Sequence, residues 1–78
     1  MSVTVLYFAS LRDAAGVASE QVASPASLAD LYAELRQRHG FSMDPGDLRV
    51  AVDGAFARWD APVGDCREIA FLPPVSGG

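Results

Sequence analysis

The chain has 78 residues, of which 50% are hydrophobic and 21% are charged, so its composition is that of a small folded domain rather than a disordered segment. A domain of this length has one thin core and no room for an enclosed active site, which argues against a self-sufficient enzyme and favours a carrier, a binding module or a subunit. The six basic residues, all arginine, stand against ten acidic ones and form no cluster. A net charge of −4 without a basic cluster argues against nucleic acid or an anionic membrane as the partner.

The first part of the chain predicts two strands around a short helical turn. Residues 2–9 are rich in β-branched and aromatic side chains and are apolar on both faces, which is typical of a central strand. Ser10 is expected to cap a helical turn that ends at Gly16. Residues 17–24 alternate loosely, which predicts an edge strand that pairs with the first strand as a hairpin.

Residues 27–39 have the clearest pattern and predict a helix. Ser27 is the expected N-cap, with Asp30 in the capping-box position, and Gly40 is the expected residue after the helix. The apolar residues follow helical spacing and form one stripe, which consists of Leu28, Leu31, Tyr32 and Leu35. We therefore expect this helix to pack one face on a sheet. His39 is interpreted as a cation in the last turn, because no Asp or Cys lies at a useful spacing from it.

The second half of the chain predicts three more strands. Residues 48–52 and 55–59 flank an Asp53-Gly54 turn, which is a strong hairpin signal, and residues 67–72 form the last strand. Residues 41–47 form a loop. The order strand–strand–helix–strand–strand–strand predicts an α+β domain of the β-grasp type, a mixed sheet of about five strands with one main helix packed across it. The first and last strands should lie side by side and parallel in its centre.

One predicted surface feature comes from alternation along residues 55–59. Phe56 and Arg58 should share one face, while Trp59 should lie on the other face and belong to the core. Phe56, Tyr7 and Leu72 are then candidates for a partner-docking patch on the open face of the sheet. The alternative is that all three are ordinary core residues.

Cys66 is the only cysteine, which excludes an internal disulfide and suits a reducing compartment. Its neighbour Arg67 could lower the pKa of the thiol, but we expect an incidental thiol without a role in sulfur chemistry. No apolar run approaches the roughly 20 residues of a membrane helix, and no positive charge precedes the first apolar stretch. We therefore expect a cytoplasmic protein. The sequence has no zinc pair, phosphate loop or catalytic triad, so we expect no bound metal or cofactor.

The last residues contain the strongest functional signal. Pro73 and Pro74 stop strand pairing and hold the chain near polyproline geometry, whereas Gly77 and Gly78 have no side chains and can pass through a narrow channel. We therefore predict a folded domain over residues 1–72. Residues 73–78 are expected to form an extended tail with a reach of at most ~20 Å. The bland alternative is a frayed chain end.

The terminal carboxylate of such a tail is an accessible reactive group that stays inert until it is activated. ATP can convert it to an acyl-adenylate, and a persulfide sulfur can then convert it to a thiocarboxylate that holds one sulfur atom. The tail would have to fit an activating enzyme and a sulfur-consuming enzyme in turn. Because this chain has no phosphate-binding loop, the ATP would be bound by the activating partner.

Four segments resemble the MoaD/ThiS group of ubiquitin-like sulfur carriers, and within it the small subunits of molybdopterin synthases, so that the resemblance covers essentially the whole chain. They are residues 5–9 (VLYFA), the helix after Ser27, residues 51–54 (AVDG) and residues 69–78 (IAFLPPVSGG). The last is the most specific, because thiamine-pathway carriers usually lack the Pro-Pro pair.

The resemblance implies that Gly78 is adenylated by a ubiquitin-activating-type adenylyltransferase and thiocarboxylated with sulfur from a persulfide donor. Residues Pro73, Pro74, Val75, Ser76 and Gly77 would enter the large subunit of molybdopterin synthase. Sulfur would then pass to cyclic pyranopterin monophosphate during molybdenum cofactor biosynthesis. The chain would be non-catalytic alone and part of a heterotetramer of two small and two large subunits. The alternatives are a carrier for thiamine or cysteine synthesis, a ubiquitin-like modifier joined to lysines, and an interaction domain with an inert tail.

Overall fold

The computed structural model of the chain describes residues 2–74. Its elements follow the order β1 (Ser2–Tyr7), α1 (Ala9–Ala15), β2 (Ser19–Ala23), α2 (Leu28–His39), a 3₁₀ turn (Pro45–Asp47), β3 (Arg49–Val52), β4 (Ala55–Ala57) and β5 (Glu68–Leu72). Neither helix has the length and apolar character that a crossing of the membrane would require in this part of the chain.

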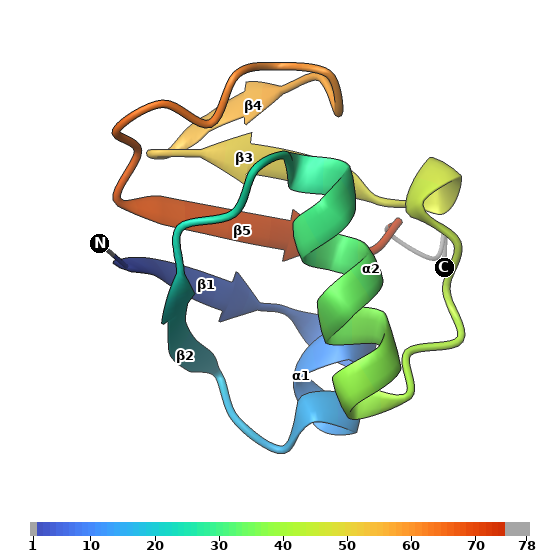
Figure 1. Ribbon diagram of the computed structural model, residues 1–78. Coiled ribbons are helices and arrows are strands. Elements are labelled where there is room, and N and C mark those ends of the chain that lie inside the picture. Colours follow the sequence, from blue (N-terminus) through green and yellow to red (C-terminus); the bar gives the residue numbers. More distant parts are fainter. Residues whose placement is uncertain (1, 75–78) are drawn as a thin grey trace.

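The five strands form one mixed sheet in the order β2-β1-β5-β3-β4, and α2 lies across one of its faces (Figure 1). The central pair β1 and β5 is parallel, as predicted, and the other neighbouring strands are antiparallel. The register places Val5 beside Ile69 and Tyr7 beside Phe71 in this central pair. The predicted α+β β-grasp arrangement is therefore confirmed.

The core lies between the sheet and α2, because one face of each central strand and one stripe of the helix are apolar. The predicted stripe of α2 is fully buried, with Leu28, Leu31, Tyr32 and Leu35 each no more than 1% exposed. Trp59 packs against this core and contacts the rings of Tyr32 and Phe71, as the alternation predicted. Burial of each large apolar side chain contributes roughly 1.5–3 kcal/mol relative to its exposure to water.

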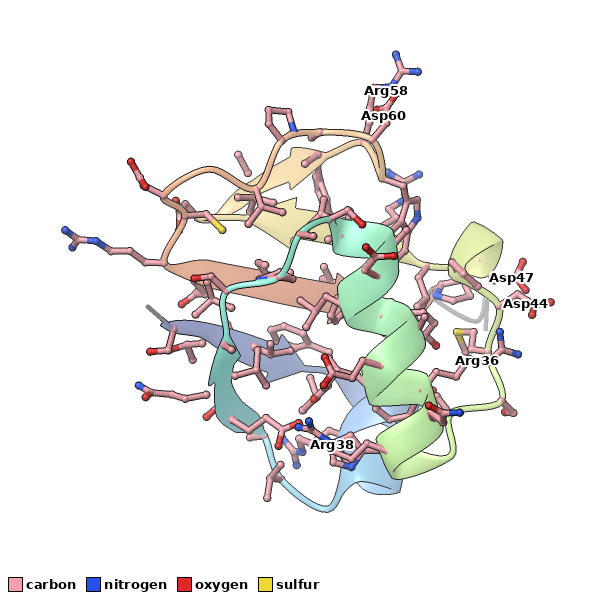
Figure 2. The ribbon with its side chains drawn as sticks, viewed as in Figure 1. Arg36, Arg38, Asp44, Asp47, Arg58 and Asp60 are labelled. Atoms are coloured by element: carbon pink, nitrogen blue, oxygen red, sulfur yellow. The ribbon has the colours of Figure 1, made fainter. Side chains whose placement is uncertain are left out.

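Helix α2 begins and ends at the predicted residues. The Ser27 hydroxyl accepts a hydrogen bond from the backbone N–H of Asp30 at 3.0 Å, and Gly40 has the left-handed conformation that terminates many helices. Beyond the helix, the Arg36 guanidinium reaches the following loop, where it donates to the carbonyl of Phe41 and forms a 3.1 Å ion pair with Asp44 (Figure 2). These contacts fasten the loop that leads to β3.

The short helix α1 starts earlier than the sequence indicated. The predicted cap Ser10 lies inside the helix, and the N-cap position belongs to Phe8, whose backbone is extended and whose side chain makes no capping hydrogen bond. The expectation for Ser10 is wrong because the chain turns sharply at Ala9, which has a φ of +52°. Gly16 ends the helix with a φ of +79°, as predicted.

The turn between β3 and β4 also fastens the start of β5. Asp53 and Gly54 have positive φ values of 51° and 86°, the geometry of the tight hairpin turn that this dipeptide predicted. The Asp53 carboxylate accepts hydrogen bonds from the backbone N–H groups of Arg67 and Glu68 at 2.9 and 3.0 Å. One acidic side chain thus links the β3–β4 turn to the start of β5 and aligns the strand that leads to the tail.

Candidate functional site

The face of the sheet opposite α2 has an apolar row across four strands. The strand register places Leu6, Ala70, Ala51 and Phe56 beside one another, from β1 through β5 and β3 to β4. Together with Phe8, Gly54, Glu68 and Leu72 they line a shallow hollow of about 240 Å³. We define the open-face patch as Leu6, Phe8, Ala51, Phe56, Ala70 and Leu72.

Two aromatic rings of the open-face patch are unusually accessible. Phe56 is 68% exposed and Phe8 is 43% exposed, although both would be more stable in contact with other apolar groups. The expected exposed position of Phe56 is thus present in the structure. A contiguous apolar surface with aromatic side chains is typical of a site where another protein binds.

Tyr7 does not belong to the open-face patch, contrary to the expectation from sequence. It points to the α2 side of the sheet and is only 2% exposed. Successive side chains in a strand point to opposite faces, so the next residue, Phe8, takes the place on the open face. The aromatic residue that a partner can reach is therefore Phe8, directly after β1, which sequence reasoning missed.

The backbone beside Phe8 is strained. Ala9 has a φ of +52°, in a region that costs a residue with a side chain roughly 1–2 kcal/mol. This turn ends β1 and starts α1 immediately after Phe8, which leaves the ring at the margin of the sheet. Phe8 shares its strand face with Leu6, and this alternation is a signal that could have indicated the position of Phe8 on the open face. The other face of the strand is equally apolar, so the pattern alone did not decide between Phe8 and Tyr7.

The open-face patch extends to the base of the predicted tail. Leu72 is the last residue of β5 and is half-buried, and Pro73 and Pro74 follow it outside the ladder. The expectations for Val75, Ser76, Gly77 and Gly78 lie outside the described residues and stay predictions. Any partner that binds the patch therefore also lies next to the start of the tail.

Tyr7, Glu20 and His39 form a polar cluster at the margin of the core. The Glu20 carboxylate accepts a hydrogen bond from the Tyr7 hydroxyl, and its Oε1 lies 2.7 Å from Nε2 of His39. Burial tends to raise the pKa of Glu20, but the two hydrogen bonds outweigh it and lower that pKa below its ordinary value. Burial, the hydrogen bond and the negative charge of Glu20 all raise the pKa of Tyr7.

This cluster joins β1, β2 and the end of α2, so it fixes the helix on the sheet. The sequence indicated no Asp or Cys partner for His39, and the structure supplies Glu20, 19 positions earlier in the chain. The His39 ring also meets the edge of Tyr7, with ring centroids 5.6 Å apart. We interpret the cluster as structural, since its three members are engaged with one another and lie on the side away from the open-face patch.

Cys66 is buried, and its neighbour Arg67 does not lower the pKa of its thiol. Burial raises the pKa of the thiol, and the negative charges of Asp53 and Asp65 raise it further. A protonated, buried thiol is a poor nucleophile. Over residues 2–74, no three histidine, cysteine or acidic side chains come close enough together to hold a metal ion.

The chain is similar to known proteins over nearly its whole length. The ThiS family matches residues 5–78. The molybdopterin synthase sulfur carrier subunit of Escherichia coli (strain K12) is 32% identical over 80 residues, which cover 97% of this chain and 99% of the relative. The protein of the same name from Haemophilus influenzae is 31% identical over the same shares of the two chains.

Solved structures also resemble this chain over nearly its whole length. A putative molybdopterin converting factor, subunit 1, from Pyrococcus furiosus has a TM-score of 0.78 and 34% identity, and the match covers 96% of this chain and 99% of that one. Small archaeal modifier protein 1 from Haloferax volcanii has a TM-score of 0.77 and 26% identity over the whole of both chains.

A third structure is the complex of subunits 1 and 2 of the molybdopterin-converting factor from Helicobacter pylori 26695, with a TM-score of 0.68 and 25% identity over the whole of both chains. The fold, the open-face patch at the base of the tail and the match over residues 5–78 lead to one conclusion. This chain belongs to the ThiS family, the MoaD/ThiS group of ubiquitin-like proteins.

Proposed function

We propose that this chain is the sulfur-carrier subunit of a molybdopterin synthase, in which the carboxyl group of Gly78 holds the sulfur. The observation that supports this most strongly is the match over 97% of the chain to relatives of that name. The ending PPVSGG points the same way. The folded body contributes the docking surface, and the chemistry takes place at the end of the tail.

The proposed chemistry has three steps. The Gly78 carboxylate attacks the α-phosphate of ATP on a ubiquitin-activating-type adenylyltransferase, and pyrophosphate leaves. A persulfide sulfur on a donor protein attacks the acyl carbon and displaces AMP, which gives an acyl disulfide. A thiol then cleaves the S–S bond, so that the chain keeps a thiocarboxylate and the two thiols form a disulfide.

Delivery of the sulfur would occur on the large subunit. The sulfur of the thiocarboxylate attacks a carbon of cyclic pyranopterin monophosphate and replaces an oxygen substituent, whose bond to that carbon breaks and which leaves with the electron pair. Water then hydrolyses the resulting thioester, which leaves the sulfur on the pterin and restores the Gly78 carboxylate. This chain's own contribution is to present that group at the end of a narrow segment that Pro73 and Pro74 stiffen. Leu72, Phe8 and Phe56 provide an apolar surface at the base of that segment, on which the large subunit docks.

Intact-mass measurement tests the proposal. The chain is incubated with ATP, the adenylyltransferase and a persulfide donor, and we expect a mass gain equal to the exchange of one oxygen for one sulfur. The Gly78 deletion should abolish both this gain and sulfur transfer to the pterin, with the thermal midpoint unchanged. Cys66→Ser is the matched control and should show the same mass gain, because the sulfur is expected on Gly78. A persulfide on Cys66 would be recognised by its different mass, since it adds a whole sulfur atom. Sulfur transfer by the Gly78 deletion would contradict the mechanism.

A second candidate function is a ubiquitin-like modifier, which the likeness to small archaeal modifier protein 1 favours. Activation of Gly78 would be shared, but the acyl group would pass to a lysine amine of a target protein. The same incubation in a cell extract distinguishes the two, since a modifier yields adducts of higher mass with other proteins. The chain has no lysine, so it would form no lysine-linked polymers of itself. A carrier for thiamine or cysteine synthesis would share the mass gain and differ only in the acceptor.

A further inference from the structure

Arg49 is a cation at the tail end of the open-face patch. It is the first residue of β3, it is exposed, and the strand register places it directly beside Leu72. Its guanidinium carbon lies 5.8 Å from the centre of the Phe56 ring, within the range of a cation–π contact. Arg49 therefore contacts one exposed ring of the open-face patch and neighbours the last residue before the tail.

The Arg49 guanidinium has no acidic partner within residues 2–74. The ion pairs of this part of the chain involve Arg36, Arg38, His39 and Arg58, and none includes Arg49. Arg58, by contrast, lies beside Asp60 (Figure 2) and pairs with it at 3.4 Å. A cation without an acidic partner among residues 2–74, next to the apolar open-face patch of a chain of net charge −4, is suited to a group from outside the molecule.

The opposite end of the same face has the opposite charge. Glu68 lines the open-face hollow and lies four residues before Leu72 in β5, which separates the two ends by about 13 Å at ~3.3 Å per residue. The apolar row lies between this carboxylate and Arg49. A partner with the complementary arrangement can bind in one orientation only, because the reversed orientation would bring like charges together.

We propose that Arg49, held over Phe56 at the base of the tail, binds a carboxylate of the large synthase subunit and fixes the direction from which the tail enters that subunit. The inference rests on the proposed function, and the large subunit is chosen because a solved relative, subunit 1 from Helicobacter pylori, is in complex with subunit 2. The contact with Phe56 holds the guanidinium in place before binding and leaves its N–H donors for the carboxylate. Arginine presents these donors as a planar fork that matches a carboxylate at two points.

Binding of the large subunit to four forms of the full chain tests this inference. Arg49→Glu should weaken binding by at least about 30-fold, because arginines are frequent interface hot spots and the exchange would set two carboxylates against each other. Arg49→Lys keeps the charge but loses the fork, and should weaken binding by roughly 3- to 10-fold. Arg67→Glu is the matched control, since Arg67 is exposed and precedes the far end of β5, and it should change affinity less than about 3-fold. Thermal midpoints of all four forms establish that each is folded.

Two further measurements distinguish a charge contact between Arg49 and the large subunit from an indirect effect, in which Arg49 only holds the Phe56 ring in position. The association rate of the wild type should fall with added salt, and the rate of Arg49→Glu should fall less steeply. Exchange of a single acidic residue of the large subunit for arginine should restore binding to Arg49→Glu. If Arg49→Glu binds within 3-fold of the wild type while Phe56→Ala binds poorly, the inference about Arg49 is wrong, whereas the open-face patch is still supported as the docking surface. If the wild type does not bind the large subunit at all, the proposed function itself fails.

Discussion

Phe56→Ala and Phe71→Ala form a pair that separates docking from folding. The two rings lie on opposite faces of the same sheet, with Phe56 on the open face and Phe71 completely buried against α2. We expect Phe56→Ala to impair binding of the large subunit with little effect on stability. Phe71→Ala should lower the stability much more, and should impair binding only to the extent that the chain is unfolded.

The exposed fractions set the expected magnitudes. A phenylalanine buries roughly 150–250 Å² when it is fully enclosed, so Phe56, with about a third of its surface covered, buries about 50–80 Å². At about 25 cal/mol per Å², its removal lowers the free energy of unfolding by at most about 1–2 kcal/mol. Phe71→Ala should cost about 3–5 kcal/mol, because a cavity adds to the lost burial. A chain of this length has only about 4–12 kcal/mol of total stability.

Urea denaturation and calorimetric titration with the large subunit measure the two effects. Truncation of an exposed aromatic anchor should weaken binding by roughly 30-fold or more. A loss of more than about 3 kcal/mol in the free energy of unfolding of Phe56→Ala would show that this ring belongs to the core. Unchanged affinity in the same variant would show that the open-face patch is not where the large subunit docks.

Two other predictions concern buried groups. Because its hydrogen bonds lower the pKa of Glu20, its contribution to stability is present above the ordinary glutamate pKa of about 4.3 and is lost as the pH falls through the lower folded value. Tyr7→Phe should therefore lower the free energy of unfolding by about 1.5–3 kcal/mol at pH 7, and by clearly less at pH 3, in urea titrations; an equal loss at both pH values would refute the role of the carboxylate. Since burial raises the pKa of Cys66, iodoacetamide should alkylate it much more slowly than free glutathione at pH 7.5, and urea should abolish the difference. Rapid alkylation of the folded chain, or loss of sulfur transfer in Cys66→Ser, would instead indicate a thiol that takes part in the reaction.

Helix α2 and the β3–β4 hairpin were predictable because their signals are local. Ser27 caps the helix through an amide three residues away, and Asp53-Gly54 adopts its turn through its own backbone preferences. Such interactions involve neighbours in sequence, so the residue types alone indicate them.

The position of the aromatic residue of β1 was not predictable in the same way. Val3, Val5 and Tyr7 form one face of the strand, and Leu6 and Phe8 belong to the other, so both alternations are apolar. The side on which α2 packs decides between them, and that is a property of the whole fold. Sequence reasoning accordingly chose Tyr7 where the structure exposes Phe8.

The contact between Glu20 and His39 depends on tertiary structure as well. It forms only after β2 has paired with β1 and α2 has crossed the sheet. Neither residue type nor spacing within the chain indicates such a pair. The same holds for the burial of Cys66, which raises the pKa of its thiol although the next residue in the chain is the cation Arg67.

The central position of β5 has a mechanical consequence. A partner that pulls on Pro73 transmits the load to β5, which is bonded to β1 along one side and to β3 along the other. The load then acts along the strand, in shear, and is shared by both ladders, whereas an outer strand would peel away one hydrogen bond at a time. The body can therefore hold together when a partner pulls on the chain that follows β5.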